Sequence, residues 1–353
     1  MKKVLFFLQS GVGGAERVTV TIGKNLNRDK FDVLFCLVGD AKGLLNIENF
    51  IPKEYALLRI PKCRGFRLIH ALKKIIAREK PDVVFSSITF VNTKLLALAP
   101  FFPKIKFVVR NNNYIYTLSA IQKLVLRVFY RFADAVIAQT DEMSLELVDK
   151  IKLPQKKVYT LQNPIDTLTI DEKKNEHSPF VEKNDVVYVA SGRCQPVKGF
   201  DILVKAFKLV LNQQPNARLH ILGKITENCE ACYIEVVKLA KELGVSDKIF
   251  FEGFQLNPYA FVKNADCFVL SSRNEGLPNV LIESLYLKTP VAATKCIPVI
   301  SRIVEDGVNG FLAEPEDAES LASAMLKASK LGRVNSNYHS ASMNEFQRII
   351  DND

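Results

Sequence analysis

Short apolar runs alternate with amphipathic stretches along this chain of 353 residues. In the first half, mostly apolar runs that predict strands lie at 4–8, 33–38, 83–86, 107–110 and 136–139. Between them, residues 15–26, 66–79 and 120–132 have the apolar spacing of helices. Strands of nearly continuous apolar residues that alternate with helices are typical of a parallel α/β sheet covered on both faces.

The same scheme restarts after a polar, aperiodic segment at 167–184, which we predict to be a linker. A strand at 186–190, a glycine-containing loop and a helix at 200–211 repeat the order in which the chain begins. We therefore predict two Rossmann-like domains at 1–166 and 185–338, with parallel sheets facing across a cleft. The last residues, 339–353, are expected to form a helix that packs back on the N-terminal domain.

Composition places the chain among soluble globular proteins, with 48% hydrophobic and 24% charged residues. The apolar run at 4–8 is too short for a secretory signal and is better interpreted as a buried strand. The seven cysteines are scattered and odd in number, which does not fit a secreted disulfide framework. Cys229 and Cys232 form a C-x-x-C without a second ligand pair, so we interpret it as incidental.

The net charge of +10 is unevenly distributed. Residues 1–166 hold 27 Lys and Arg against 14 Asp and Glu, whereas residues 167–353 hold 21 against 24. A basic first half indicates an anionic partner, such as a membrane surface, a phosphorylated acceptor or nucleic acid. No stacking-aromatic pattern or recognition motif supports nucleic acid.

Two carboxylates eight positions apart, Glu275 and Glu283, flank the turn Gly-Leu-Pro-Asn and the start of an apolar helix. Asn279, or the turn before it, can cap this helix. The free N–H groups of a helix N-terminus suit a phosphate, and the flanking carboxylates suit sugar hydroxyls. The alternative is a pair of solvated glutamates around an ordinary helix start.

In each half of the chain, one glycine-containing loop follows the first strand. Gly11-Val12-Gly13-Gly14 lets backbone approach a ligand, although its spacing lacks the third glycine of a dinucleotide fingerprint. Gly192 to Gly199 carries Arg193 and Lys198, two cations on a strand-to-helix loop, the place where such folds bind ligands. Each loop could instead be an ordinary solvated turn.

Taken together, these motifs resemble those of retaining glycosyltransferases of family 4, which have the fold called GT-B. The resemblance rests on the ordered set Gly13-Gly14-Ala15-Glu16-Arg17, Asn163-Pro164, Gly192-Arg193 with Lys198-Gly199, the run 271–283, and Glu305-Asp306-Gly307 with Gly310-Phe311-Leu312. It covers nearly the whole chain and is strongest from Val186 to Pro315.

The resemblance implies a role for each motif. Glu283 is expected to bind the ribose hydroxyls of a nucleoside-diphosphate sugar, and Glu275 the transferred sugar. Arg193 and Lys198 would bind the diphosphate and neutralise the leaving group. Backbone N–H groups at Gly276 and Leu277 would face the sugar, with Gly13 and Gly14 approaching from the other domain.

One departure from the family concerns a histidine that many relatives place in the first domain. None of the four histidines falls at a strand end there, and the loop after 107–110 continues as Arg110-Asn111-Asn112. Arg110 and Asn111 are therefore candidates for positioning donor or acceptor. No Asp-x-Asp pair follows a strand, so we expect no metal and no other cofactor.

The helix at 120–132 has an apolar stripe with Lys123, Arg127 and Arg131 around it. It could face the core, or it could touch anionic lipid, as the basic charge of this half favours. The leading hypothesis is a cytoplasmic enzyme, peripheral on the inner face of the plasma membrane. It would transfer a hexose or N-acetylhexosamine, from a UDP-sugar in preference, to a lipid-linked or glycan acceptor of bacterial surface polysaccharide. The alternatives are a nucleotide-sugar epimerase of the same fold and a non-catalytic sugar-nucleotide binding protein.

Overall fold

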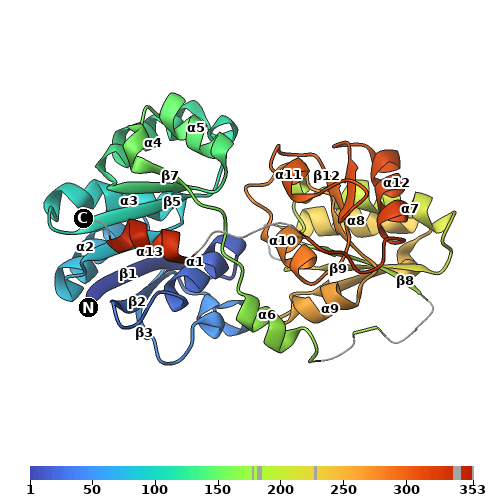
Figure 1. Ribbon diagram of the computed structural model, residues 1–353, viewed down its shortest axis with the longest axis horizontal. Helices are drawn as coiled ribbons and strands as arrows, with labels where there is room; N and C mark the ends of the chain where they lie inside the picture. Colours follow the sequence, from blue (N-terminus) through green and yellow to red (C-terminus); the bar gives the residue numbers. More distant parts are fainter. Residues whose placement is uncertain (177–178, 181–184, 226–228, 337–342, 352–353) are drawn as a thin grey trace. The chain divides into compact units, whose positions relative to one another are not determined.

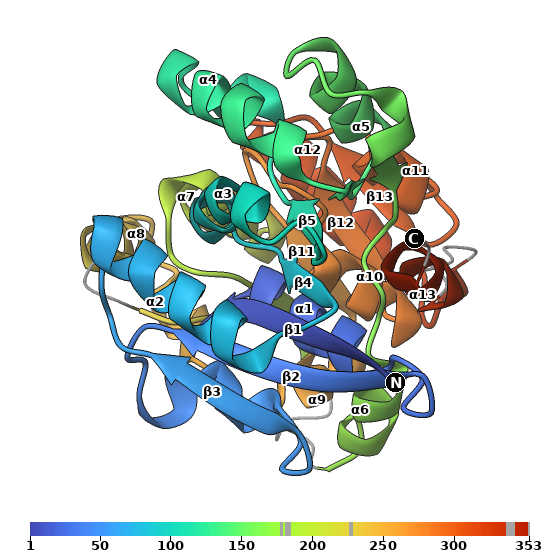
Figure 2. The ribbon, with the colours of Figure 1, turned by 90° about the vertical axis from the view of Figure 1, so that its left-hand side faces the viewer.

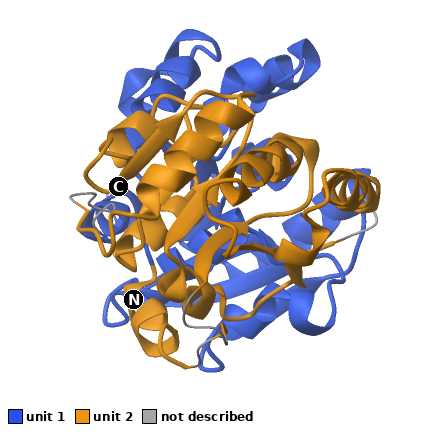
Figure 3. Ribbon diagram, turned by 90° about the vertical axis from the view of Figure 1, so that its right-hand side faces the viewer, with its two compact units in different colours: residues 1–165, 340–353 blue, residues 166–339 orange. Residues whose placement is uncertain are grey.

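The computed structural model describes residues 1–176, 179–180, 185–225, 229–336 and 343–351. The chain divides into two compact units, coloured separately in Figure 3. Unit 1 comprises Met1–Ile165 with Ser340–Asp353, and unit 2 comprises Asp166–His339. Each unit is an α/β fold around one parallel sheet, so the predicted fold class of two Rossmann-like domains is confirmed.

The sheet of unit 1 has seven strands in the order β3-β2-β1-β4-β5-β6-β7 (Figures 1 and 2). Its strands are β1 (Lys2–Gln9), β2 (Phe31–Val38), β3 (Ala56–Ile60), β4 (Val83–Ser86), β5 (Lys106–Asn111), β6 (Ala135–Ala138) and β7 (Val158–Thr160). Its helices are α1 (Gly14–Lys24), α2 (Gly65–Glu79), α3 (Thr89–Leu98), α4 (Ala120–Phe129), α5 (Asp141–Asp149) and α13 (Met343–Asp351).

Both faces of this sheet are covered, which explains why β1 reads as an unbroken apolar run. Phe6 packs on Phe35 and Phe85 in a cluster on one face, while Leu5 and Phe7 are fully buried on the other. The C-terminal helix α13 contributes Phe346, Ile349 and Ile350 to the first cluster. The last helix of the chain therefore belongs to the core of unit 1.

The sheet of unit 2 has six strands in the order β10-β9-β8-β11-β12-β13 (Figure 1). Its strands are β8 (Val186–Ser191), β9 (Ala217–Leu222), β10 (Ile249–Gly253), β11 (Cys267–Leu270), β12 (Val291–Thr294) and β13 (Gly310–Ala313). Its helices are α6 (Thr167–Lys173), α7 (Phe200–Leu211), α8 (Glu230–Glu242), α9 (Pro258–Asn264), α10 (Asn279–Tyr286), α11 (Ile300–Ile303) and α12 (Ala318–Ala328).

The segment 167–184 is not an aperiodic linker throughout, because it begins with helix α6. The Asp166 side chain caps this helix by accepting a hydrogen bond from the Thr169 N–H, and Ile170 is fully buried. Asn257 at the start of α9 donates to the Lys173 carbonyl oxygen, which ties the end of α6 to unit 2. One buried side chain and one cap are too weak a pattern to predict a helix of seven residues.

Helix α4 begins as its sequence predicts but does not face the core. Ser119 and Gln122 form a capping box at its N-terminus. Of its ten residues only Leu126 is buried, whereas Ile121 is 76% and Leu124 62% exposed. The core-facing interpretation of this apolar stripe is therefore wrong, and the stripe lies on the surface of unit 1.

Candidate active site

The topological switch point of unit 2 lies between β8 and β11. From β8 the chain continues to β9 and β10 on one side, and β11 begins the other side of the sheet. The loops that leave neighbouring strands in opposite directions open a crevice at their carboxyl ends, where open α/β sheets bind ligands. The two loops are Gly192–Gly199, after β8, and Ser271–Pro278, after β11.

These two loops are packed directly against each other. Gly199 ends a 3₁₀ turn over Pro196–Lys198 with a positive φ of 63°, and an added Cβ there would lie 2.1 Å from the Ser271 carbonyl oxygen. Only glycine fits this left-handed, close-packed position. The Ser271 hydroxyl donates to the Lys198 carbonyl oxygen at 2.8 Å, which fixes the two backbones together.

This packing brings Lys198 and Glu275 into an ion pair. The Lys198 Nζ lies 2.6 Å from Glu275 Oε1, and the Ser272 hydroxyl donates to the same oxygen at 2.6 Å. The Lys198 and Glu275 side chains are only 22% and 11% exposed. A cation and a carboxylate from residues 77 positions apart therefore share one partly buried place at the switch point.

Arg273 holds the loops in this arrangement, and the sequence analysis did not select it. Its guanidinium makes a bidentate pair with Asp201 on α7, with both N–O distances at 2.8 Å. It also donates to the Pro196 carbonyl oxygen at 2.6 Å and pairs with Glu316. These hydrogen bonds lower the pKa of Asp201 and raise that of Arg273. A cation two residues before Glu275 was the signal in the sequence that could have revealed it.

Glu283 and the turn before it lie at the start of α10. The helix begins at Asn279, with Pro278 at the N-cap position and no capping side-chain hydrogen bond. Asn279 is therefore the first helical residue and not the cap. Glu283 follows one turn later and is half-buried, and Gly276 is half-buried while Leu277 is buried.

Arg193 lies exposed on the loop after β8, in contrast to Lys198. Its neighbour Gly192 is held by a hydrogen bond from its N–H to the Leu222 carbonyl oxygen. No hydrogen bond or ion pair of the Arg193 side chain is found within the described ranges. The structure thus brings Lys198 and Glu275 together and leaves Arg193 at the rim of the loop, available to a ligand.

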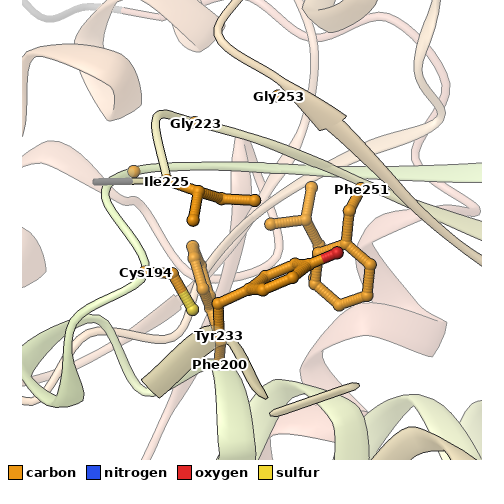
Figure 4. A pocket seen from close by; sticks show the side chains of 9 residues that line it. Cys194, Phe200, Gly223, Ile225, Tyr233, Phe251 and Gly253 are labelled. Carbon is orange, nitrogen blue, oxygen red and sulfur yellow. The ribbon is translucent and has the colours of Figure 1, made fainter. Parts of the chain in front are cut away.

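An apolar pocket lies beside Gly192 at the carboxyl ends of β8, β9 and β10 (Figure 4). It is lined by Gly192, Cys194, Phe200, Ile221, Gly223, Ile225, Tyr233, Phe251 and Gly253. Gly223 is required here, because an added Cβ would lie 1.8 Å from the Gly192 carbonyl oxygen. Motif spacing in the sequence does not reveal this pocket, because its residues come from six separate elements or loops.

In unit 1, Gly13 is the N-cap residue of α1, and Gly14 begins the helix. The carboxylate of Glu16 covers this end, since an added Cβ on Gly13 would lie 2.4 Å from Glu16 Oε2. The structure shows the helix N-terminus facing a carboxylate of its own first turn. Gly14 itself is exposed.

Arg110 and Asn111 end strand β5 but do not present their side chains to a ligand. Arg110 is 0% exposed and Asn111 1% exposed. The guanidinium donates to Asn163, while its Nε and Nη1 atoms have no partner within the described residues. Burial lowers the pKa of Arg110 to about 9. Direct positioning of donor or acceptor by the Arg110 side chain does not agree with this placement.

Neither a metal centre nor a membrane span stands out in the described part of the chain. Within it, no group of three or more His, Cys, Asp or Glu side chains is placed to hold a metal ion. No helix there combines the length and apolar character needed to cross a bilayer. His177 and His339, two of the four histidines, lie outside the described residues.

Comparison with known proteins gives matches over both units. The chain is 32% identical over 244 residues to an uncharacterized glycosyltransferase of Methanocaldococcus jannaschii, covering 64% of this chain and 59% of that protein. It is 26% identical to the Campylobacter jejuni N-acetylgalactosamine-N,N'-diacetylbacillosaminyl-diphospho-undecaprenol 4-alpha-N-acetylgalactosaminyltransferase, covering 99% of this chain and 97% of that protein.

The fold is also that of a solved structure, Anabaena HepE in complex with UDP and glucose. The TM-score is 0.80 at 20% identity, covering 99% of this chain and 95% of the other. The family model for glycosyl transferases group 1 matches residues 170–344, and the model for glycosyltransferase family 4 matches residues 12–168. The chain belongs to the family 4 glycosyltransferases, which have the GT-B fold.

Proposed function

We propose that the protein is a retaining, metal-independent glycosyltransferase that transfers a hexose or N-acetylhexosamine from a UDP-sugar. Its acceptor would be a lipid-linked or glycan intermediate of bacterial surface polysaccharide. The observation that carries the proposal is the convergence of Lys198, Glu275 and the start of α10 at the switch point of unit 2. A cation, a carboxylate and a helix N-terminus together match a sugar joined to a diphosphate.

In this proposal the loop after β8 binds the charged diphosphate, and the segment after β11 binds the hydroxyl groups of the two sugars. Negative charge grows on the nucleoside diphosphate as the glycosidic bond breaks, and Lys198 and Arg193 stabilise it. Because both loops are fixed by backbone contacts, this stabilisation needs little reorganisation and favours the transition state. Glu275, held by Ser272, accepts hydrogen bonds from the transferred sugar, and Glu283 from the ribose.

Lys198 and Glu275 contact each other, which gives the donor a defined place to enter. The sugar and the phosphate of a donor are covalently joined, so their two recognition groups must be neighbours. A 2.6 Å pair satisfies this requirement and neutralises each partly buried charge until the donor arrives. The cations would then supply the neutralisation that a metal supplies in other enzymes.

The relatives support the choice of donor and acceptor. The Anabaena neighbour was solved with UDP and glucose, and the Campylobacter transferase is named for a diphospho-undecaprenol substrate. A lipid-linked acceptor would bring the protein to the inner face of the plasma membrane. The exposed side chains Ile121 and Leu124 of α4, beside Arg127, are our candidate contact with an anionic lipid surface.

A panel of UDP-, GDP- and ADP-sugars, screened by thermal stabilisation, tests the donor, and the product made with the selected donor tests the reaction. We expect a UDP-sugar to raise the Tm and to be consumed with release of UDP when an undecaprenyl-diphosphate glycan is added. The product linkage should keep the anomeric configuration of the donor, as read by NMR.

Three outcomes would contradict parts of this proposal. Release of an epimerised nucleotide sugar would favour the epimerase, and binding without turnover on any acceptor would favour a binding protein. Loss of activity with a chelator, and its rescue by Mn²⁺ or Mg²⁺, would overturn the metal-independent reaction. An inverted product would overturn retention.

A further inference from the structure

Three cysteines from different parts of unit 2 gather beside the loop that carries Arg193. Cys194 follows Arg193 and is 5% exposed, and Cys232 lies in the first turn of α8. The Cys194 Sγ lies 3.8 Å from the Cys232 Sγ. Cys229, at the N-cap position of α8, is close enough to influence the pKa of both thiols. The C-x-x-C of the sequence is therefore not isolated, because the loop after β8 supplies a third thiol.

We propose that Cys194 and Cys232 are a redox pair whose disulfide ties the loop after β8 to helix α8 and reshapes the pocket beside Gly192. A disulfide needs its sulfurs about 2.05 Å apart, so the two sulfurs must approach by about 2 Å. Rotation about the Cα–Cβ bond moves the sulfur of each cysteine, and Cys194 lies in a loop while Cys232 lies in the first turn of α8.

A disulfide between Cys194 and Cys232 would change the shape of the pocket, because it would link two parts of its wall. The Cys194 side chain lines it together with Tyr233, the residue after Cys232 (Figure 4). A disulfide would draw the first turn of α8 toward the loop and fix the wall between these two residues. Arg193 precedes Cys194 directly, so the same bond would restrict the backbone of this cation.

The chemistry is thiol–disulfide exchange with a low-molecular-weight disulfide such as oxidised glutathione. The Cys232 thiolate attacks one sulfur of the oxidant, forms a mixed disulfide and releases one thiolate. The Cys194 thiolate then attacks the Cys232 sulfur and releases the second. The protein loses two protons and two electrons, and the oxidant becomes two thiols.

The order of attack follows from exposure and hydrogen bonding. Cys232 is half-buried and Cys194 buried, so the oxidant reaches Cys232 first. The Cys194 thiol donates toward Cys232 and favours its thiolate, while burial raises the pKa of Cys194 to about 12. Burial raises the pKa of Cys232 as well, so the exchange should be slow without an excess of oxidant.

Non-reducing peptide mapping of the full chain tests the pair, with one sample incubated in oxidised glutathione and a control sample in reduced glutathione before alkylation. We expect a linked Cys194–Cys232 peptide, lighter than the reduced pair by two hydrogens, which dithiothreitol removes. Amide hydrogen exchange over residues 192–199 should become slower in the oxidised protein. A Cys229–Cys232 link, or no link at a large excess of oxidant, would overturn the proposal.

The effect on ligand binding rests on the proposed donor site and is measured separately. Oxidation should weaken UDP affinity about tenfold, a loss that 1.4 kcal/mol of binding free energy produces. Cys232→Ser should abolish this difference, while Cys63→Ser, a half-buried cysteine of unit 1, should retain it. Equal weakening in Cys232→Ser would overturn the role of the pair.

The two proposals fail in different measurements. If the reduced wild-type protein binds no nucleoside diphosphate, the donor site is wrong, while the mapped disulfide and the slower exchange still decide the redox pair. If UDP binds but Cys194 and Cys232 never link, the redox pair is wrong and the donor site stands.

Discussion

The two units have the same architecture at their switch points but carry different chemistry there. In unit 1 the sheet reverses between β1 and β4, and the residues that follow these strands, Ser10 and Ser87, are neutral, buried and hydrogen-bonded within the unit. The Thr19 hydroxyl, for example, lies 2.6 Å from the hydroxyl of the buried Ser87. In unit 2 the corresponding strand ends hold the Lys198–Glu275 pair and the exposed Arg193.

Topology thus determines where in each unit a ligand can bind, and the side chains there determine which ligand binds. Arg110, the cation at the β5 end in unit 1, is fully buried without an acidic partner in the described structure. Burial keeps the Arg110 guanidinium away from the surface of unit 1, whereas Lys198 and Arg193 lie on loops at strand ends, where such folds bind ligands. This contrast supports our proposal that unit 2 binds the diphosphate.

The largest effect is expected from removing both cations of unit 2. The double substitution Arg193→Ala and Lys198→Ala should lower kcat by about 10²–10³-fold or more, because each stabilises charge that grows in the transition state. Lys205→Ala, an exposed cation on α7, is the matched control and should leave kcat unchanged. Steady-state rates close to wild type in the double variant would remove the proposed role of this switch point.

A smaller effect, a loss of UDP affinity, is expected from changing Glu283, which we propose binds the ribose of the donor. Glu283→Gln keeps the shape of the side chain but loses a charged acceptor, which is worth about 1.5–3 kcal/mol, or roughly 10–150-fold in Kd. Calorimetric titration with UDP measures this directly, with Glu235→Gln on the exposed side of α8 as control. Unchanged affinity would show that Glu283 does not hold the ribose.

The proposed lipid contact of unit 1 can be tested at the exposed apolar stripe of α4. Ile121→Ser with Leu124→Ser removes the two most exposed apolar side chains of the helix and should lower partition onto anionic vesicles by about tenfold or more. Sedimentation with vesicles containing phosphatidylglycerol measures it. The Leu145→Ser variant, which alters an exposed leucine on α5, is the control. Equal binding by the double variant would place the lipid contact elsewhere.

The smallest effect concerns the clamp between the two loops of unit 2. Asp201→Asn should cost about 1–2 kcal/mol of unfolding free energy at pH 7, because it breaks a bidentate, partly exposed pair with Arg273. The folded-state pKa of Asp201 lies below its ordinary value of 3.8. Its stabilisation is therefore present above pH 3.8 and lost as the pH falls through the lowered pKa.

Denaturant unfolding of wild type and Asp201→Asn at several pH values checks this linkage. The difference between them should shrink toward zero on acidification below the lowered pKa. A difference that stays constant down to the acid limit would mean that Asp201 does not contribute through its charge. Asp317→Asn, which alters the N-cap residue of α12, provides a carboxylate control that pairs with no arginine in the described part of the chain.

The fold could be predicted from the sequence because each buried parallel strand is recognisable from its own short run of apolar residues. Strands β1, β2 and β4 appear as apolar runs, and the glycosyltransferase family follows from an ordered set of motifs. It did not predict helix α6 or the short strand β7, whose few residues carry little pattern. It could not decide whether the α4 stripe faced the core, since core and membrane contacts use the same amphipathic spacing.

The sequence indicated several residues of the candidate site, but it did not indicate which of them contact each other. Glu275 and Lys198 were selected separately, and only the folded chain joins them across 77 positions. Arg110 was selected for its place after a strand, yet burial depends on neighbours such as Asn163 that sequence spacing does not reveal. Arg273 and the Cys194–Cys232 contact were missed for the same reason, because each is a tertiary pairing.

Hydrogen exchange with and without a UDP-sugar tests the central assignment most directly. If the donor occupies the switch point of unit 2, amides in residues 192–199 and 271–283 should show the largest slowing when the donor is added. Segments at the opposite edge of that sheet from the pocket, such as residues 310–313 of β13, should change little. Binding that leaves both loops unchanged, with protection confined to unit 1, would contradict the account.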